Sequence, residues 1–204
     1  MVPALSMNSS DPIDAPDALS NILAQAALGE ESAWVELVEL YSRRVFAMAR
    51  SRLHDDELAE EITQSVFVTL ASKLTDSSYT EQNRFEPWLF RITMNRVRDY
   101  CRKRSRHARP TAPEVFSSIA GKADDDLADR SETQNQLDQM RVAMEQLSDS
   151  DRQLIELRHH GQLSFKQIAQ ITGDPIGTLL ARHHRALKKL RNCIDSTKGS
   201  ETQS

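Results

Sequence analysis

Apolar residues recur at intervals of three and four along most of this chain, which is the spacing of an amphipathic α-helix. The first such stretch covers about residues 19–53, and Gly29 is expected to separate two helices within it. A third helix is predicted over residues 56–74 and a fourth over residues 86–106. Residues 75–84 are polar and interrupt the pattern, so we expect a loop there.

The helical spacing resumes in the second half of the chain after a long interruption. Two prolines, small residues and an acidic run separate the halves, which is the composition of a linker. Both ends of the chain are polar and are expected to be disordered. The predicted organisation is a leader (1–20), a first helical module (21–106), a flexible linker (107–136), a second helical module (137–194) and a tail (195–204).

The composition agrees with an all-α fold and excludes several classes of protein. Glycine is scarce, with 6 in 204 residues, and the abundant Ala, Leu, Glu, Gln and Arg favour helix. No apolar run approaches the length of a membrane span, and no secretory signal is visible. Cys101 and Cys193 match no metal-ligand spacing, which is typical of free thiols in a reducing cytoplasm. We therefore expect a cytoplasmic protein that is not inserted in a membrane.

Charge is distributed unevenly along the chain. The whole sequence has 26 Lys and Arg against 30 Asp and Glu, yet seven basic residues fall within residues 86–106. On a helical wheel, one stripe beside Trp88 carries Arg91, Asn95, Arg98 and Arg102. A cationic stripe edged by an aromatic ring suits backbone phosphates and unstacked bases. Taken alone, however, the stretch is explained equally well as a solvated basic helix end.

A turn typical of helix-turn-helix proteins precedes a second basic helix. Ser164 and Gln167 form a capping-box pattern at the start of a short helix over residues 165–171. Gly173 suits the left-handed residue that ends a helix, and Pro175 suits the first position of the next. Two helices joined by a three- or four-residue turn that contains Gly are the helix-turn-helix signature.

The second helix of this pair has an outward stripe of its own. The stripe consists of Thr178, Arg182, Arg185 and Lys189. The inward face is predicted to consist of Ile176, Leu179, Leu180, Ala186, Leu187 and Leu190. Such a helix can lie in the major groove of DNA and reach phosphates and base edges. The alternative is a plain helical hairpin with a solvated basic face.

An acidic cluster opens the third predicted helix. Its members are Asp55, Asp56, Glu57, Glu60 and Glu61. Acids at a helix N-terminus interact favourably with the helix dipole, which explains the cluster without any partner. The functional alternative is a docking patch for a basic protein surface, with Gln64 and Phe67 as less charged anchors. The residues alone do not decide between these two readings.

Three segments together resemble the extracytoplasmic-function (ECF) sigma factors, the two-domain initiation subunits of bacterial RNA polymerase. They read ELAEEITQSVFVTLASKL, FEPWLFRITMNRVRDYCRKRSR and MEQLSDSDRQLIELRHHGQLSFKQIAQITGDPIGTLLARHHRALKKLR. The resemblance implies that the first module binds the clamp helices of the polymerase β′ subunit through Glu60, Glu61, Gln64 and Phe67. It also implies that this module melts and holds the −10 promoter element, using Trp88, Arg91, Asn95, Arg98 and Arg102.

The resemblance assigns duplex reading to the second module. The −35 element would be contacted by Thr178, Arg182, Arg185 and Lys189. In the first module, the polar loop over 75–84 would take an unstacked base of the −10 element. The linker acids Asp124, Asp125, Asp126 and Asp129 would mimic nucleic acid inside the polymerase. Where the family commonly reads Gly-Thr-Val-Lys-Ser-Arg, this chain has Leu180 in place of the cation, which removes a phosphate contact. Release from an anti-sigma factor is common in the family, although nothing in this chain reveals such a partner.

Two other classes of function compete with this interpretation. A stand-alone helix-turn-helix regulator would explain the second module but leaves the Trp88-edged stripe and the acidic helix without a task. An enzyme could use Glu156 and His159, whose spacing builds a di-metal site when two copies are present, but the sequence has one copy. The sequence has neither a Gly-rich phosphate loop nor a nucleophile motif. We therefore expect no catalytic residue, no metal and no cofactor.

Overall fold

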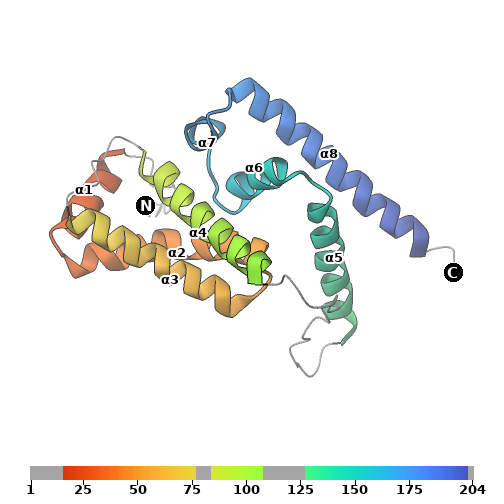
Figure 1. Ribbon diagram of the computed structural model, residues 1–204, viewed down its shortest axis with the longest axis horizontal. Helices are drawn as coiled ribbons and strands as arrows, with labels where there is room; N and C mark the ends of the chain where they lie inside the picture. The colour runs from red at the N-terminus through yellow and green to blue at the C-terminus, as the bar shows by residue number, and fades with distance from the viewer. Residues whose placement is uncertain (1–15, 77–83, 108–126, 202–204) are drawn as a thin grey trace, which may run out of the picture.

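The computed structural model describes residues 16–76, 84–107 and 127–201, and within these ranges it is all-α, with no strand. This confirms the predicted fold class. In chain order the helices are α1 (Pro16–Ala27), α2 (Glu31–Leu53), α3 (Asp56–Thr75), α4 (Phe85–His107), α5 (Leu127–Glu145), α6 (Asp149–His159), α7 (Phe165–Thr172) and α8 (Ile176–Glu201) (Figure 1). In the structure the first module consists of α1–α4 and the second module of α5–α8.

Local sequence signals place several of the helix ends. Gly29, with φ of 87°, separates α1 from α2 as predicted. The Asp55 carboxylate accepts a hydrogen bond from the Leu58 amide and so caps the start of α3. Ser164 and Gln167 make the predicted capping box of α7, and Gly173 ends that helix in the left-handed conformation with φ of 79°. These positions are therefore determined by local chemistry.

Three predicted boundaries are wrong because the helices run further than the apolar spacing indicates. Helix α1 begins at Pro16, inside the expected leader, and proline is well suited to the first turn of a helix. Helix α5 begins at Leu127, inside the expected linker, and α8 continues to Glu201, through most of the expected tail. Both extensions contain few apolar residues, so periodicity misses them. The predicted base-binding loop falls almost wholly outside the described residues, and so do Asp124, Asp125 and Asp126.

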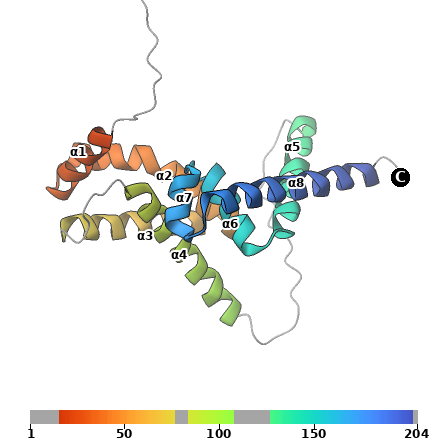
Figure 2. The same cartoon turned by 90° about the horizontal axis from the view of Figure 1, so that it is seen from above.

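The first module packs three helices around α2. Helix α2 contacts α1, α3 and α4, and α3 also packs against α4. Leu37, Tyr41, Val45 and Met48 of α2 are buried, as expected for residues that follow one another at steps of four, four and three on one helix face. On α4, Leu89 and Phe90 are fully buried as well. The C-terminal turns of α4 stand clear of the other helices in Figure 2, so the basic end of this helix is presented outward.

The second module packs against the first. Helix α7 contacts α4, and α6 contacts α2 (Figures 1 and 2). The large apolar cluster of the first module continues into the second, where it includes Leu154, Leu157, Leu163, Ile168 and Leu179. Modules that were expected to be joined only by a linker therefore share a core in this structure.

A smaller core lies between α5, α6 and α8. It consists of Ala143, Leu147, Ile155, Ala186 and Leu190. The inward face predicted for α8 is only partly correct, because Leu179, Ala186 and Leu190 are buried whereas Ile176, Leu180 and Leu187 are exposed. On a helical wheel the three exposed residues lie to one side of the buried stripe, which is the face of α8 that packs against α5, α6 and α7.

Candidate nucleic-acid interface

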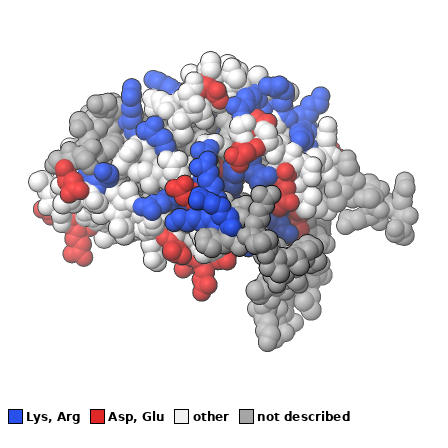
Figure 3. Space-filling view, viewed as in Figure 1, with Lys and Arg blue, Asp and Glu red and all other residues white. Residues whose placement is uncertain are grey.

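The basic stripe of α4 lies at the surface. Arg91, Asn95 and Arg102 are exposed, and basic side chains gather over α4 in the middle of the face drawn in Figure 3. Trp88 is half-buried, with its ring 6.1 Å from that of Phe85. The aromatic residue is therefore anchored in the module, while the polar and basic side chains next to it point outward.

Arg98 differs from the other members of the stripe. Its guanidinium donates a hydrogen bond to the Gln153 side chain on α6, and it is half-buried. Arg96 is also turned away from the stripe, since its Nη2 donates to Thr69 Oγ1 of α3 over 2.9 Å. The structure thus separates the basic residues of α4 into an outward set and two residues engaged within the protein.

The basic stripe of α8 is divided in a similar way. Thr178, Arg185 and Lys189 are exposed, and basic side chains also gather over α8 at the upper edge of Figure 3. The Arg182 side chain is 18% exposed, and it forms ion pairs with Asp151 (3.0 Å) and Asp174 (2.8 Å). Two cations of this stripe, Arg185 and Lys189, are therefore exposed, while the third, Arg182, ties α8 to α6 and to the turn before α8.

These cations line a pocket of about 310 Å³ between α8 and the start of α6. Arg182, Arg185 and Lys189 contribute positive charge, and Asp151 contributes the opposing carboxylate. Burial works to raise the pKa of Asp151, but hydrogen bonds from Ser148 and Arg182 hold it below its ordinary value. The pocket therefore carries an excess of positive charge beside the helix-turn-helix, which suits an anionic backbone.

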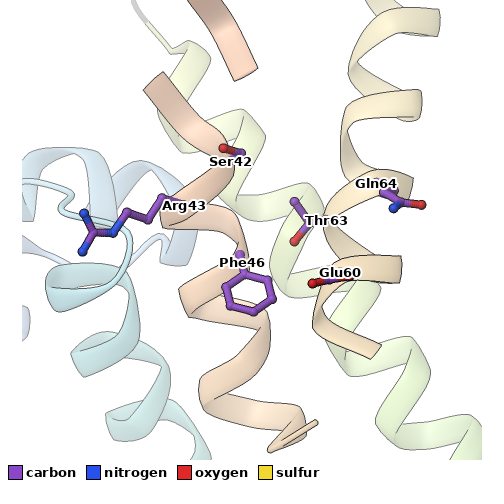
Figure 4. A pocket seen from close by; sticks show the side chains of 6 residues that line it. All are labelled: Ser42, Arg43, Phe46, Glu60, Thr63 and Gln64. Carbon is purple, nitrogen blue, oxygen red and sulfur yellow. The ribbon is translucent and has the colours of Figure 1, made fainter. Parts of the chain in front are cut away.

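The predicted polymerase-binding residues lie along one side of α3. Glu60, Glu61 and Gln64 are exposed, and Phe67 is half-buried against the core. Glu60 and Gln64 also line a groove of about 410 Å³ whose other wall is formed by Ser42, Arg43 and Phe46 of α2. Figure 4 shows Thr63 and Phe46 in the space between the two helices and the Gln64 amide on the outer side of α3. The sequence did not indicate the α2 side of this groove.

A network of charged residues joins the modules, and it was not predicted from the sequence. Arg52 of α2 donates to both carboxylate oxygens of Glu156 on α6, at 2.7 and 2.8 Å, and pairs with Asp149 at 2.5 Å. Glu86 at the start of α4 pairs with Arg44 at 2.6 Å and accepts a hydrogen bond from Gln167 of α7 at 2.6 Å.

Glu156 is the most unusual member of this network because its side chain is fully buried. Burial raises the pKa of Glu156 to about 7, against the opposing attraction of the Arg52 guanidinium. Burial likewise opposes the charge on Arg52, yet the two carboxylates beside it leave its pKa raised. A signal for this site was present in the sequence, because Glu156 stands between Ile155 and Leu157 in an otherwise apolar run.

The side chains of the Glu-x-x-His pattern point to different partners. Both oxygens of Glu156 are held by Arg52, whereas the His159 ring faces His183, with 3.4 Å between their Nε2 atoms. No group of three or more potential metal ligands occurs among the residues that the structure describes. Likewise, none of the described helices is long and apolar enough to cross a membrane.

Two family models match the chain, one on each module. Sigma-70 region 2 matches residues 37–107, and Sigma-70 region 4 matches residues 143–192. The ECF RNA polymerase sigma factor SigK of Mycobacterium ulcerans is 26% identical over 182 residues, which are 89% of this chain and 96% of the relative. SigW of Bacillus subtilis, an ECF RNA polymerase sigma factor as well, is 26% identical over 178 residues, covering 83% of this chain and 92% of the relative.

Solved structures share the fold over both modules. CnrH, solved in complex with the cytosolic domain of CnrY, has a TM-score of 0.65 at 24% identity and covers 88% of this chain and 99% of its own. RpoE of Bartonella quintana, solved with the anti-sigma factor NepR, has a TM-score of 0.56 at 24% identity and covers 78% and 95%. The two family models occur in the expected order on the two modules, and the relatives match over nearly their whole length. This chain therefore belongs to the ECF RNA polymerase sigma factors.

Proposed function

We propose that this sigma factor directs transcription initiation through two DNA-reading surfaces, one on each module. The outward residues of α4, with Trp88 at their edge, would hold the melted −10 element as a single strand. The exposed stripe of α8, within the helix-turn-helix, would read the −35 element as duplex. The observation that carries this proposal is the presence of two basic surfaces on different modules, each within a matched sigma region.

The polymerase contact is assigned to α3 and its groove with α2. Glu60, Glu61 and Gln64 present an acidic and polar face, which suits a basic helical partner such as the clamp helices of the β′ subunit. The neighbouring groove supplies the apolar Phe46 for a partner side chain. The place of action would be the cytoplasm, where polymerase and promoter DNA meet, and the chain itself would carry out no bond-making step.

An anti-sigma factor is a further proposed partner. RpoE of Bartonella quintana, which shares this fold, was solved with the anti-sigma factor NepR. The exposed apolar residues of α8, namely Ile176, Leu180 and Leu187, offer such a protein a surface outside the two cores.

Co-purification with core RNA polymerase tests the assignment of the α3 face. We expect stoichiometric binding of the wild-type chain and weaker binding of the Gln64→Ala and Phe67→Ala variants. Thr69→Ala is a control on the same helix, since Thr69 faces Arg96 of α4. If the chain retains duplex DNA but does not bind polymerase, a stand-alone helix-turn-helix regulator becomes the better description.

A further inference from the structure

Two histidines face each other across the contact between α6 and α8. His159 is the last residue of α6, and His183 lies two turns into α8. Their Nε2 atoms are 3.4 Å apart, whereas their ring centroids are 5.6 Å apart with an interplanar angle of 17°. Because the Nε2 atoms are much closer together than the ring centres, each ring presents this nitrogen to the other. The second module therefore brings two imidazole nitrogens from different helices to one point.

The distance between the two nitrogens suits a shared metal ion better than a direct hydrogen bond. Hydrogen bonds from N–H to oxygen are about 2.7–3.2 Å long, and the contact between these nitrogens is longer. In a tetrahedral site with metal–nitrogen bonds of about 2.0–2.1 Å, two nitrogen ligands lie about 3.3–3.4 Å apart. An ion would lie beside the line that joins the two atoms, so each ring must turn slightly. The exposed position of His159 allows that rotation.

Neighbouring residues hold the His183 ring in place. The Phe165 ring meets it edge-on, with centroids 5.3 Å apart and an interplanar angle of 82°. The Arg158 guanidinium lies over the Phe165 ring at 5.2 Å, and its Nη1 donates to the Leu163 carbonyl oxygen over 2.8 Å. His183 is half-buried in this setting. One of the two imidazoles is therefore positioned before an ion arrives, which reduces the conformational entropy lost on binding.

The charges around His183 favour the neutral ring that a metal ion requires. Burial lowers the pKa of His183, and the positive charges of His159, Arg158 and His184 lower it further. The ring therefore has an unprotonated nitrogen near pH 7. The Arg158 charge also opposes a bound cation, so we expect an ion that binds and leaves with its concentration rather than a permanent one.

We propose that His159 and His183 form a two-histidine site for a divalent transition-metal ion of the Zn²⁺, Ni²⁺ or Cu²⁺ class, which fastens α8 to α6 when it binds. Imidazole nitrogen suits these ions, whereas Mg²⁺ and Ca²⁺ prefer oxygen ligands. Two positions of a tetrahedral ion remain for water, which distinguishes this site from the closed four-ligand sites of structural zinc. The proposal goes beyond promoter recognition and does not depend on it.

Calorimetric titration of the untagged full-length chain with ZnCl₂ tests the site. We expect a single ion to bind per chain, and MgCl₂ to give no binding. His159→Ala and His183→Ala should each weaken zinc binding by about 100-fold, because the second ligand of a chelate acts at a high effective concentration. Both side chains lie outside the two apolar cores, so both variants are expected to fold.

The neighbouring histidines provide matched controls. His160→Ala removes an imidazole directly after α6, and His184→Ala removes one from the next position of α8. Both controls should bind zinc as the wild type does. Electron paramagnetic resonance of the Cu²⁺-loaded chain gives a second readout, with two nitrogen ligands expected in the wild type and one in His159→Ala or His183→Ala.

Thermal unfolding tests whether the ion fastens the helices. An ion that binds only the folded chain raises the unfolding midpoint. We expect ZnCl₂ to raise it in the wild type and in the two controls, but not in His159→Ala or His183→Ala. Binding without such a rise would contradict the fastening of α8 to α6.

Three results would overturn the site itself. One is that the wild-type chain does not bind zinc. Another is binding that His159→Ala and His183→Ala leave unchanged, or that the controls weaken equally, which would indicate an adventitious ion only. The third is a single nitrogen ligand in the copper spectrum of the wild type. Failure to bind core polymerase would instead count against the proposed function and would leave each of these outcomes decisive.

Discussion

The buried apolar residues of the first module all belong to the large core, whereas those of the second module are divided between two cores. In the first module, α1–α4 contribute a continuous set of buried side chains centred on α2. In the second, Leu154 and Leu157 join that large cluster, while Ile155 joins the small one. One short helix, α6, therefore serves both cores. The helix-turn-helix module therefore depends on its contact with the first module for part of its burial.

The largest expected effect is the loss of stability on truncating a buried leucine, and it compares the large core with the small one. Leu37→Ala in the first module should lower the free energy of unfolding by about 2–5 kcal/mol, because Leu37 is fully buried and its truncation leaves a cavity in the core. Leu190→Ala, in the small core, should cost near the lower end of that range. Chemical denaturation followed by circular dichroism measures both. Equal losses would contradict the view that the two cores differ.

The pH dependence of stability tests the buried carboxylate between the modules. The pKa of Glu156 is raised from 4.5 to about 7 in the folded chain, so the folded state binds the proton more tightly. Protonation of Glu156 therefore stabilises the folded chain fully below about pH 4.5. This stabilisation is lost as the pH rises to about 7, a change on the order of 3 kcal/mol in the free energy of unfolding. Charged neighbours that act on it are Arg52 of α2 and Asp149 and Arg152 of α6.

The variant Glu156→Gln isolates this contribution. Burial lowers the pKa values of His54, His160 and His183, so these groups destabilise the folded chain as the pH falls through their range. The difference in unfolding free energy between wild type and variant removes the histidine contributions. It should decline from pH 4.5 to pH 7 and stay level above. A flat difference across that range would contradict a raised pKa.

Two glycines of the second module test how closely the modules approach. Gly161→Ala would place a Cβ 2.7 Å from the Leu157 carbonyl oxygen and 3.0 Å from Met48, so we expect a loss of about 1–3 kcal/mol. Gly177 has open space around it and lies on α8, so Gly177→Ala should stabilise the chain by about 0.5–1 kcal/mol. Thermal unfolding measures both changes. A change in stability of the same sign in both variants would contradict a close approach of the modules at Gly161.

The smallest expected effect concerns the cations of α8. Arg185→Ala should reduce the slope of log affinity for duplex DNA against log salt by about one. Among the residues that the structure describes, Arg185 is exposed, forms no ion pair and bonds only to the Ala181 carbonyl oxygen of its own helix, so it can neutralise a phosphate. Arg182 lies on the same predicted stripe and was expected from the resemblance to contact the −35 element. Since Arg182 is paired with Asp151 and Asp174, we now expect its loss to lower stability more than the slope. Salt titrations of both variants distinguish the two roles.

Local chemistry explains which parts of the fold were predictable. The capping box at Ser164 and the left-handed Gly173 are determined by a few adjacent residues, so their patterns identified them. The extensions of α5 and α8 have few apolar residues, and periodicity therefore missed them. The pairing of Arg52 with Glu156 joins residues 104 positions apart and depends on how the modules dock, which no local pattern encodes.

For the proposed −10 surface, too, local pattern indicated some features and not those that depend on the docking of the modules. Helical spacing identified the stripe of α4, and Arg91, Asn95 and Arg102 do lie exposed. Spacing could not indicate that Arg98 is taken up by Gln153, because that partner belongs to the other module. The roles of these residues toward DNA stay predictions that require transcription experiments.

Transcription reconstituted from purified core RNA polymerase, this chain and genomic DNA fragments tests the central claim most directly. We predict initiation at a set of start sites that core polymerase alone does not use. The combined variant Arg91→Ala with Arg102→Ala should lose those transcripts while still binding polymerase. The control Arg96→Ala should keep them, because Arg96 is turned toward Thr69 and away from the stripe. If the wild-type chain binds polymerase and yet adds no start sites, the account of promoter recognition is contradicted.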